Sequence, residues 1–218
     1  MILSTILLLA MAGAGTPPEA VIARMEQWTA QQQRLLPSYQ GRRRYFITHP
    51  LLNGETSALV EEHFRTPEQK QFQVLERHGM RELENRVFSP LLEAELATAH
   101  DPQRAATEIC RRNYSFRFLF HDAGPGAYVF EIEPRTSNPY LFRGKIWVDE
   151  REFAIRQIEG EPAQRPSVWV RSTHFVHQFA KFGNFWLPVR HRSEVDLVVF
   201  GRARMGIDYL EYQWEDSK

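Results

Sequence analysis

The chain has 218 residues, and its 27 Lys and Arg are balanced by 27 Asp and Glu, so the formal net charge is zero. That length fits one domain with a real hydrophobic core, and the charge balance excludes bulk electrostatic attraction to nucleic acid or to an anionic membrane. We therefore expect no nucleic-acid partner.

The first fifteen residues, MILSTILLLAMAGAG, are apolar for most of their length and end in small residues. Ala12 and Ala14 fit a small-x-small cleavage signal, and the apolar run is too short to span a bilayer. The Lys or Arg that usually precedes such a run is missing. We expect residues 1–15 to be a cleaved export signal, with a buried N-terminal helix as the alternative, and residues 16–218 to form one soluble domain.

Cys110 is the only cysteine and lies far from this leader. The predicted cleavage site thus has no cysteine that could carry a lipid anchor, and no intrachain disulfide can form. The fold has to be stabilised by its core.

Helices are predicted in two parts of the chain. Thr16 is a candidate hydroxyl N-cap before two prolines, and apolar residues then recur at spacings of three and four to about residue 36. A second helical stretch covers residues 80–99, with Pro90 expected to kink or split it. A short helix follows over residues 101–111.

The remaining segments alternate apolar and polar residues between turn signals such as Asn53-Gly54 and Gly183-Asn184, which is typical of an antiparallel sheet. No repeat or linker interrupts them, so we expect one sheet with inserted helices. The predicted strands are residues 39–48, 57–66, 69–77, 114–121, 127–133, 140–148, 153–161, 167–182, 185–200 and 202–214.

The turn at Gly183-Asn184 fixes the register of the longest hairpin if Phe182 pairs with Phe185. Each arm is about fifteen residues, roughly 50 Å long at ~3.3 Å per residue, whereas ordinary strands have five or six residues. Strands that long coil into a barrel or half-barrel. The predicted fold is mainly β with α: an incomplete curved antiparallel barrel of about ten to eleven strands with a helical lid.

The apolar side of these strands is expected to face the concave interior and to line a cavity beneath the helices. A turn at residues 149–152 would pair Val148 with Phe153 and Ile146 with Ile155. The predicted lining consists of Phe142, Ile146, Val148, Phe153, Ile155, Val170, Val176, Phe185, Leu187, Val189, Val195 and Leu197.

In the predicted register a polar belt interrupts this apolar face. Two interpretations are open: a bend or bulge exchanges the two faces there, or these groups meet a polar portion of a ligand, because an unpaired polar group in an apolar cavity costs about 1–3 kcal/mol. The belt consists of Ser172, His174, His191 and Ser193.

The sequence shows no motif of a catalytic or metal site. Its eight histidines have no His-Glu-x-x-His or Cys/His ligand spacing, and no Gly-x-Ser-x-Gly elbow, Ser-x-x-Lys pair or glycine-rich phosphate loop is present. Cys110 is interpreted as a small apolar residue. We predict no enzyme activity, no cofactor, no metal and no nucleotide.

Charged pairs and runs on the predicted strands are interpreted as solvated. Glu131 and Glu133 lie opposite apolar neighbours, which favours a solvated face over an acid–base pair. Arg42-Arg43-Arg44 lies in a strand whose Tyr45 and Ile47 can point inward, and we interpret it as a solvated edge, with a contact to an anionic headgroup or a partner as the alternative.

Three segments, FRGKIWVDEREFAIRQIEGEP, FAKFGNFWLPVRHRSEV and IDYLEY, resemble the outer-membrane lipoprotein-sorting superfamily, whose fold is shared by the LolA and LolB carriers and the sensory domain of RseB. The resemblance is strongest from Tyr140 to Tyr212 and consists of strand patterning and a Phe-Trp-Leu-Pro junction. It implies a LolA-like half-barrel over residues 16–218, with an apolar cavity for acyl chains under a helical lid. It transfers no individual functional residue.

The resemblance also implies a function in the periplasm. A buried methylene contributes about 0.8 kcal/mol, so exposing a sixteen-carbon chain to water costs on the order of 12 kcal/mol, and a carrier needs an apolar cavity but no reactive residue. We expect a non-catalytic carrier or binding protein for lipids or lipoprotein acyl chains, with an inner-membrane donor and an outer-membrane acceptor. The alternative is an envelope sensory or scaffolding module that binds a protein partner with the same fold.

Overall fold

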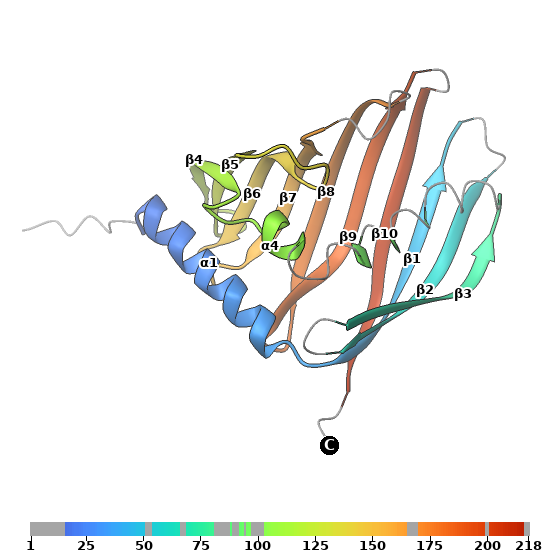
Figure 1. The fold of residues 1–218 in the computed structure, drawn as a ribbon, viewed down its shortest axis with the longest axis horizontal. Coiled ribbons are helices and arrows are strands. Elements are labelled where there is room, and N and C mark those ends of the chain that lie inside the picture. Colours follow the sequence, from blue (N-terminus) through green and yellow to red (C-terminus); the bar gives the residue numbers. More distant parts are fainter. Residues whose placement is uncertain are drawn as a thin grey trace, which may run out of the picture.

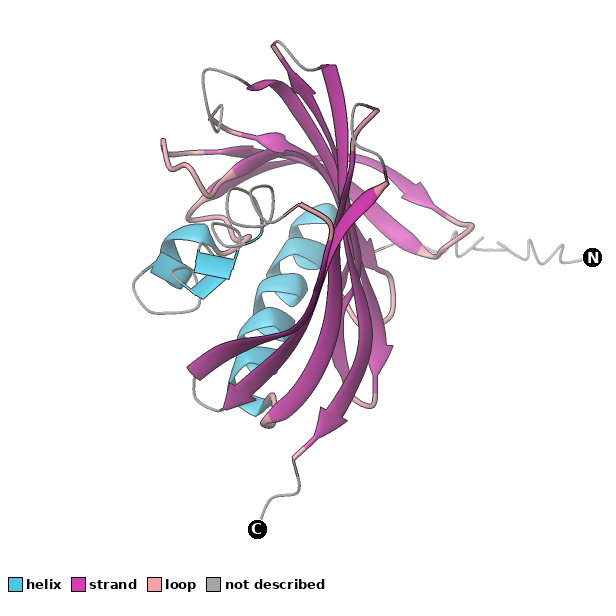
Figure 2. Ribbon diagram, turned by 90° about the vertical axis from the view of Figure 1, so that its right-hand side faces the viewer, coloured by secondary structure: helices cyan, strands magenta, loops and turns pink. Residues whose placement is uncertain are grey.

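Over the residues that the structure describes, the protein forms a ten-stranded antiparallel sheet that curves strongly, with helices on its concave face (Figures 1 and 2). The structure is a computed structural model that describes residues 16–50, 54–65, 69–80, 88, 92–93, 95–96, 103–164, 170–198 and 201–215. The predicted leader, Pro90 and most of the predicted helix 80–99 lie outside the described residues.

The strand order is β3-β2-β1-β10-β9-β8-β7-β6-β5-β4, so the last strand joins the first three to the other six. Every strand overlaps one predicted from the alternation, and the mainly β fold is confirmed. The strands are β1 (Tyr39–Thr48), β2 (Glu55–Arg65), β3 (Gln69–His78), β4 (Tyr114–Asp122), β5 (Ala127–Pro134), β6 (Phe142–Asp149), β7 (Ile155–Pro162), β8 (Val170–Phe182), β9 (Phe185–Leu197) and β10 (Gly201–Trp214).

Both described helices agree with the sequence in position but differ in detail. Helix α1 (Pro18–Leu35) has Pro17 at its N-cap, so the predicted Thr16 cap is wrong. Helix α4 (Gln103–Thr107) is shorter than the predicted 101–111. The Asn113 side chain donates hydrogen bonds to the carbonyls of Ala105 and Glu108, which satisfies backbone acceptors where α4 ends.

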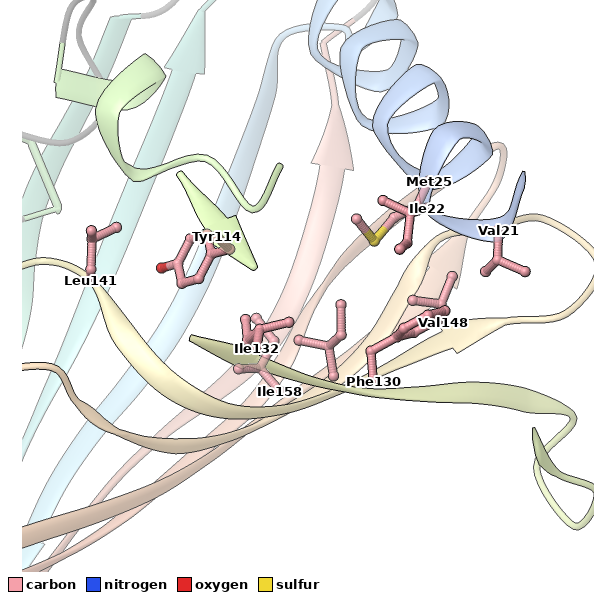
Figure 3. Close-up of a cluster of buried hydrophobic side chains, with 10 residues drawn as sticks. Val21, Ile22, Met25, Tyr114, Phe130, Ile132, Leu141, Val148 and Ile158 are labelled. Carbon is pink, nitrogen blue, oxygen red and sulfur yellow. The ribbon is translucent and has the colours of Figure 1, made fainter. Parts of the chain in front are cut away.

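Helix α1 is held on the sheet by a closed hydrophobic cluster (Figure 3). Val21 and Met25 are 0% exposed, and each fully buried side chain of this size contributes about 1.5–3 kcal/mol. Because these residues recur at helical spacing, only one face of α1 enters the core. The cluster comprises Val21, Ile22, Met25, Tyr114, Phe130, Ile132, Leu141, Ile146, Val148 and Ile158.

A second cluster packs at the other end of the concave face, over β1, β2 and β10. It contains Tyr45, Ile47, Ala58, Val60, Phe88 and Ile207. Strands β8 and β9 therefore lie between two separately packed regions of the sheet.

The hairpin of β8 and β9 begins in the predicted register and then leaves it. Phe182 pairs with Phe185 as expected, but Val189 is an extra residue in β9, which is a β-bulge. From Gln178 to Ser172 the pairs are shifted by one residue, so Phe175 pairs with Ser193 instead of the predicted Arg192. A second irregularity between Ser172 and Val170 restores the predicted pairing of Val170 with Leu197.

The pairing of β6 with β7 is also shifted from the predicted one. Val148 pairs with Ile155 because the connecting turn is longer than expected, and Ile146 pairs with Ile158 because Arg156 is in addition an extra residue in β7. Within it Phe153 has φ +59°, in the left-handed region that bulky side chains rarely adopt. The predicted partner pairs are wrong, although these side chains belong to or pack against the α1 cluster.

Candidate functional site

The predicted lining residues on β6 and β7 lie in the closed core beneath α1. Ile146 and Val148 are 0% exposed. Phe142, Phe153 and Ile155 pack against the same cluster. In this structure they hold α1, and their contact with a lipid stays a prediction.

The predicted lining residues on β8 and β9 separate into different environments. Leu187 is buried and Phe185 packs on Trp214, with ring centroids 5.6 Å apart. Val176 pairs with Arg192 and Glu159, on the face opposite to the one predicted. Val170 and Val195 are half-buried, Val189 is the bulge residue, and the side chain of Leu197 lies outside the described residues.

The bulge also divides the predicted polar belt between the two faces. Ser172 donates a hydrogen bond to Asp196 at 3.1 Å, and exposed His174 lies 3.5 Å from a Glu159 oxygen. Both are on the convex side, so their predicted place on the concave face is wrong. His191 and Ser193 remain on the concave side, and the bulge interpretation is confirmed.

His191 forms a cross-strand pair with His177, which the sequence reasoning missed. These imidazoles lie at the centre of a continuous row of paired residues that is otherwise apolar. The row runs through Ala58, Tyr45, Ile207, His191, His177, Ile158, Ile146 and Phe130. His177 lies two residues from both Phe175 and Phe179 and therefore shares their face of β8. Recognising the bulge would have placed this face on the concave side.

Aromatic rings surround the two imidazoles. His177 stacks on Phe179 with centroids 4.6 Å apart, and His191 stacks on Phe175 at 5.8 Å. On β10 the ring of Tyr209 lies parallel to His177 at 6.1 Å. The centre of the concave face is therefore lined by flat, partly buried rings.

Both imidazoles are held neutral by this environment. Burial, and then the neighbouring His191, lower the pKa of His177 to about 3. Burial, and then the Arg192 charge, lower the pKa of His191 to about 4. Neutral imidazoles can act as hydrogen-bond donor and acceptor without bringing a charge into the apolar surface.

Two polar atoms of this region have no hydrogen-bond partner among the residues that the structure describes. They are Nε2 of His177 and Oγ of Ser193, and both atoms are buried. Ser193 is only 5% exposed. In the next row of paired residues it lies between Phe175 on β8 and Met205 on β10.

A buried ion cluster lies beside the imidazoles, and it corrects the interpretation of Arg43. Arg42 and Arg44 are solvent-accessible as predicted, but Arg43 is 2% exposed and forms an ion pair with Glu62, itself 1% exposed. The sequence carried a signal for this burial, because Arg43, Tyr45 and Ile47 are every second residue of β1 and therefore point to the same, inward face.

The cluster is completed from two further segments. Nη1 of Arg43 donates to Glu95 at 2.7 Å, and Nζ of Lys70 lies 2.9 Å from Glu95 and 3.3 Å from Glu62. Burial raises the pKa of Glu95, but Lys70 and Arg43 outweigh it and hold that pKa at about 2. Two cations thus neutralise two carboxylates.

The cluster is connected to the imidazoles through one ring. The guanidinium of Arg43 lies 5.0 Å from the centre of the Tyr209 ring, whose other contacts include His177. A stacked guanidinium, phenol and imidazole therefore join β1, β10 and β8 on the concave face.

Other candidate groups are structural or solvated. Within the described ranges no three His, Cys, Asp or Glu side chains could together hold a metal ion, and no described helix is long and apolar enough to cross a membrane. Cys110 is buried, and Glu131 pairs with Arg117 at the surface.

No family model and no curated protein matches the sequence. Among solved structures, an outer membrane lipoprotein-sorting protein domain from Vibrio parahaemolyticus superposes with a TM-score of 0.53 at 8% identity, covering 92% of this chain and 94% of that one. The chain therefore has the outer-membrane lipoprotein-sorting fold.

Two further solved structures are similar to this chain over most of their length. A LolA superfamily protein from Nitrosomonas europaea gives a TM-score of 0.45 at 14% identity, covering 94% of this chain and 96% of that one. A DUF1329 family protein from Desulfovibrio piger gives 0.46 at 13% identity, covering 93% and 95%. The lipoprotein-sorting fold predicted from the strand patterning is confirmed as an unclosed curved sheet with helices on its concave face.

Proposed function

We propose that the protein is a non-catalytic periplasmic carrier or binding protein for lipids or the acyl chains of lipoproteins, which bind the concave face of β8, β9 and β10. The observation that supports this most is the set of partly buried rings between the two packed clusters. The lipoprotein-sorting fold supports it as well.

The energetics of acyl chains favour a site of this kind. Each methylene taken from water contributes about 0.8 kcal/mol, so an apolar concave surface that shields an acyl chain from water favours its binding. Release then requires an acceptor that binds the chain more strongly. We propose an inner-membrane donor and an outer-membrane acceptor as partners, and residues 1–15 as a leader whose removal N-terminal sequencing of the exported protein would detect.

The test is native mass spectrometry of the protein purified from its own cell envelope without detergent. We expect stoichiometric lipid or lipopeptide. His191→Trp, which puts a larger ring on the concave face, should lose it, whereas His174→Trp on the convex face should keep it. An empty wild-type protein that also fails to bind a fluorescent fatty acid or a diacylated lipopeptide at micromolar concentration would contradict the proposal.

A sensory or scaffolding module is the second candidate, and strand β4 favours it. β4 ends the strand order, and its Phe118 and Phe120 are 40% and 49% exposed. An exposed apolar edge strand is suited to pairing with a strand of a partner protein. A stable complex that survives His191→Trp but is lost with Phe120→Asp would favour this function over a carrier.

A further inference from the structure

The unpaired polar atoms at the centre of the concave face point to a specific kind of ligand. An unsatisfied buried donor or acceptor costs about 1–3 kcal/mol, and most buried polar groups in proteins are paired. Nε2 of His177 and Oγ of Ser193 are both buried without a partner in the described part of the chain, on adjacent strands and on the same face. Two such atoms together indicate a place where a bound molecule supplies the hydrogen bonds.

The geometry places both atoms within the span of one small polar group. His177 pairs with His191, and Ser193 pairs with Phe175, two residues away along β8. Diagonal neighbours of this kind have Cα atoms about 7–8 Å apart, with side chains that can approach each other. A glycerol-sized group would reach both, while its apolar tail lies along the rings of Phe175 and Phe179.

Among the described residues, the charges around these atoms disfavour an anionic group at this position. Arg43 and Lys70 are already paired with Glu62 and Glu95, and Arg192 forms an ion pair with Asp208. A carboxylate buried here would lose its hydration without gaining a free cation. A hydroxyl or an ester oxygen carries no such cost. A hydroxyl can serve either tautomer of His177, whereas an ester oxygen accepts a hydrogen bond from the tautomer that is protonated at Nε2.

We propose that His177, His191 and Ser193 form a subsite for an uncharged hydrogen-bonding group of the bound lipid, a hydroxyl or ester oxygen of the kind that an acylglycerol carries. This inference rests on the proposed lipid-binding function. It adds that neutral glycerides are preferred over ionised fatty acids of the same chain length.

The test compares monolauroylglycerol with laurate by isothermal titration calorimetry on the delipidated full-length protein at pH 8. We expect the wild type to bind the glyceride about tenfold more tightly. His177→Phe and Ser193→Ala should each weaken glyceride binding about threefold to tenfold, the effect of one hydrogen bond, and leave laurate binding within about twofold. His174→Phe and Ser172→Ala make the same changes on the convex face and should bind both probes like the wild type.

Each other outcome has a defined meaning. If both probes bind equally and the concave variants behave like their convex controls, the subsite is overturned while the carrier proposal stands, and the two atoms bind internal water instead. If the wild type binds neither probe, both proposals fail. Ser193→Ala removes a single oxygen, so it provides the decisive comparison should His177→Phe not fold, as judged by its circular dichroism.

Discussion

His177 and His191 meet edge to face across β8 and β9, with ring centroids 5.3 Å apart, in the middle of an apolar row. Protonating either ring would bury a cation, and protonating both would add repulsion between them. Their pKa values of about 3 and about 4 express this cost. The pair therefore links the stability of the sheet to pH.

Stability should fall as the pH decreases from about 6.5 to about 4. In that window the unfolded chain binds protons at histidines whose ordinary pKa is 6.5, while the folded protein keeps them neutral. Each histidine lowers the free energy of unfolding by up to about 1.4 kcal/mol per pH unit. Urea unfolding at a series of pH values measures this slope, which should be shallower in the double variant His177→Phe, His191→Phe.

The exposed His174 provides the control for the pH series. His174→Phe makes the same substitution on the convex face and leaves the His177–His191 pair in place, so the slope that this pair contributes should be retained. Below about pH 4 a further loss of stability is expected. The unfolded chain then binds a proton at Glu95, while the folded protein, in which the pKa of Glu95 is lowered to about 2, does not. An unchanged slope in the double histidine variant would contradict the prediction.

Arg43→Met should destabilise the protein by about 3–5 kcal/mol. Among the described residues the substitution leaves the buried Glu62 and the half-buried Glu95 with Lys70 as the remaining cation of the cluster, and breaking a buried ion pair from one side leaves an uncompensated charge. Chemical denaturation measures the loss. The second substitution in Arg43→Met, Glu62→Gln should restore part of it.

Arg42→Met is the matched control on the neighbouring residue. Arg42 pairs with Glu61 and Glu211 at the surface, with its side chain 49% exposed, so the change should cost less than about 1 kcal/mol. Equal losses for the two arginines would show that the buried cluster does not contribute as we infer.

Gly160→Ala should destabilise the sheet by more than about 2 kcal/mol. Gly160 pairs with Gly144 where β6 and β7 approach closely, and an added Cβ would lie 2.2 Å from the carbonyl oxygen of Arg143. Thermal unfolding tests this. Gly124→Ala, whose Cβ would meet only the Asp122 side chain at 3.6 Å, should change stability by less than about 0.5 kcal/mol.

Met25→Ala should cost about 2–5 kcal/mol by leaving a cavity under α1. Met25 is 0% exposed within the α1 cluster, whereas Leu35 at the end of the helix is 60% exposed. Leu35→Ala is therefore expected to have little effect on the denaturation midpoint. A mild loss at Met25 would mean that α1 packs more loosely than this structure shows.

The strands could be predicted well because each carries an alternating pattern bounded by strong turn signals. β1 occupies the predicted residues, and the Gly183-Asn184 turn fixed the first pairs of the long hairpin. Helix α1 was equally clear, since Val21 and Met25 lie one helical turn apart on one face. The fold class thus follows from local periodicity and turn chemistry.

The candidate site could be predicted only in part, because it depends on the register far from that turn. The bulge at Val189 leaves no signal in the hydrophobic pattern. Because it shifts the register, His177 lies on the concave face where the sequence predicts His174. Arg43 was missed for a different reason. A run of three arginines looks solvated, and its buried partners Glu62 and Glu95 are far away in the sequence.

The bulge at Val189 also bears on how chains with this fold can diversify. Without that extra residue, His174 and Val176 would lie on the concave face and Phe175 and His177 on the convex face. A change of one residue in strand length would therefore exchange the whole set of β8 side chains on the concave face while leaving the composition of the strand untouched. An insertion or deletion near this hairpin turn would thus change the concave surface more than a single point substitution.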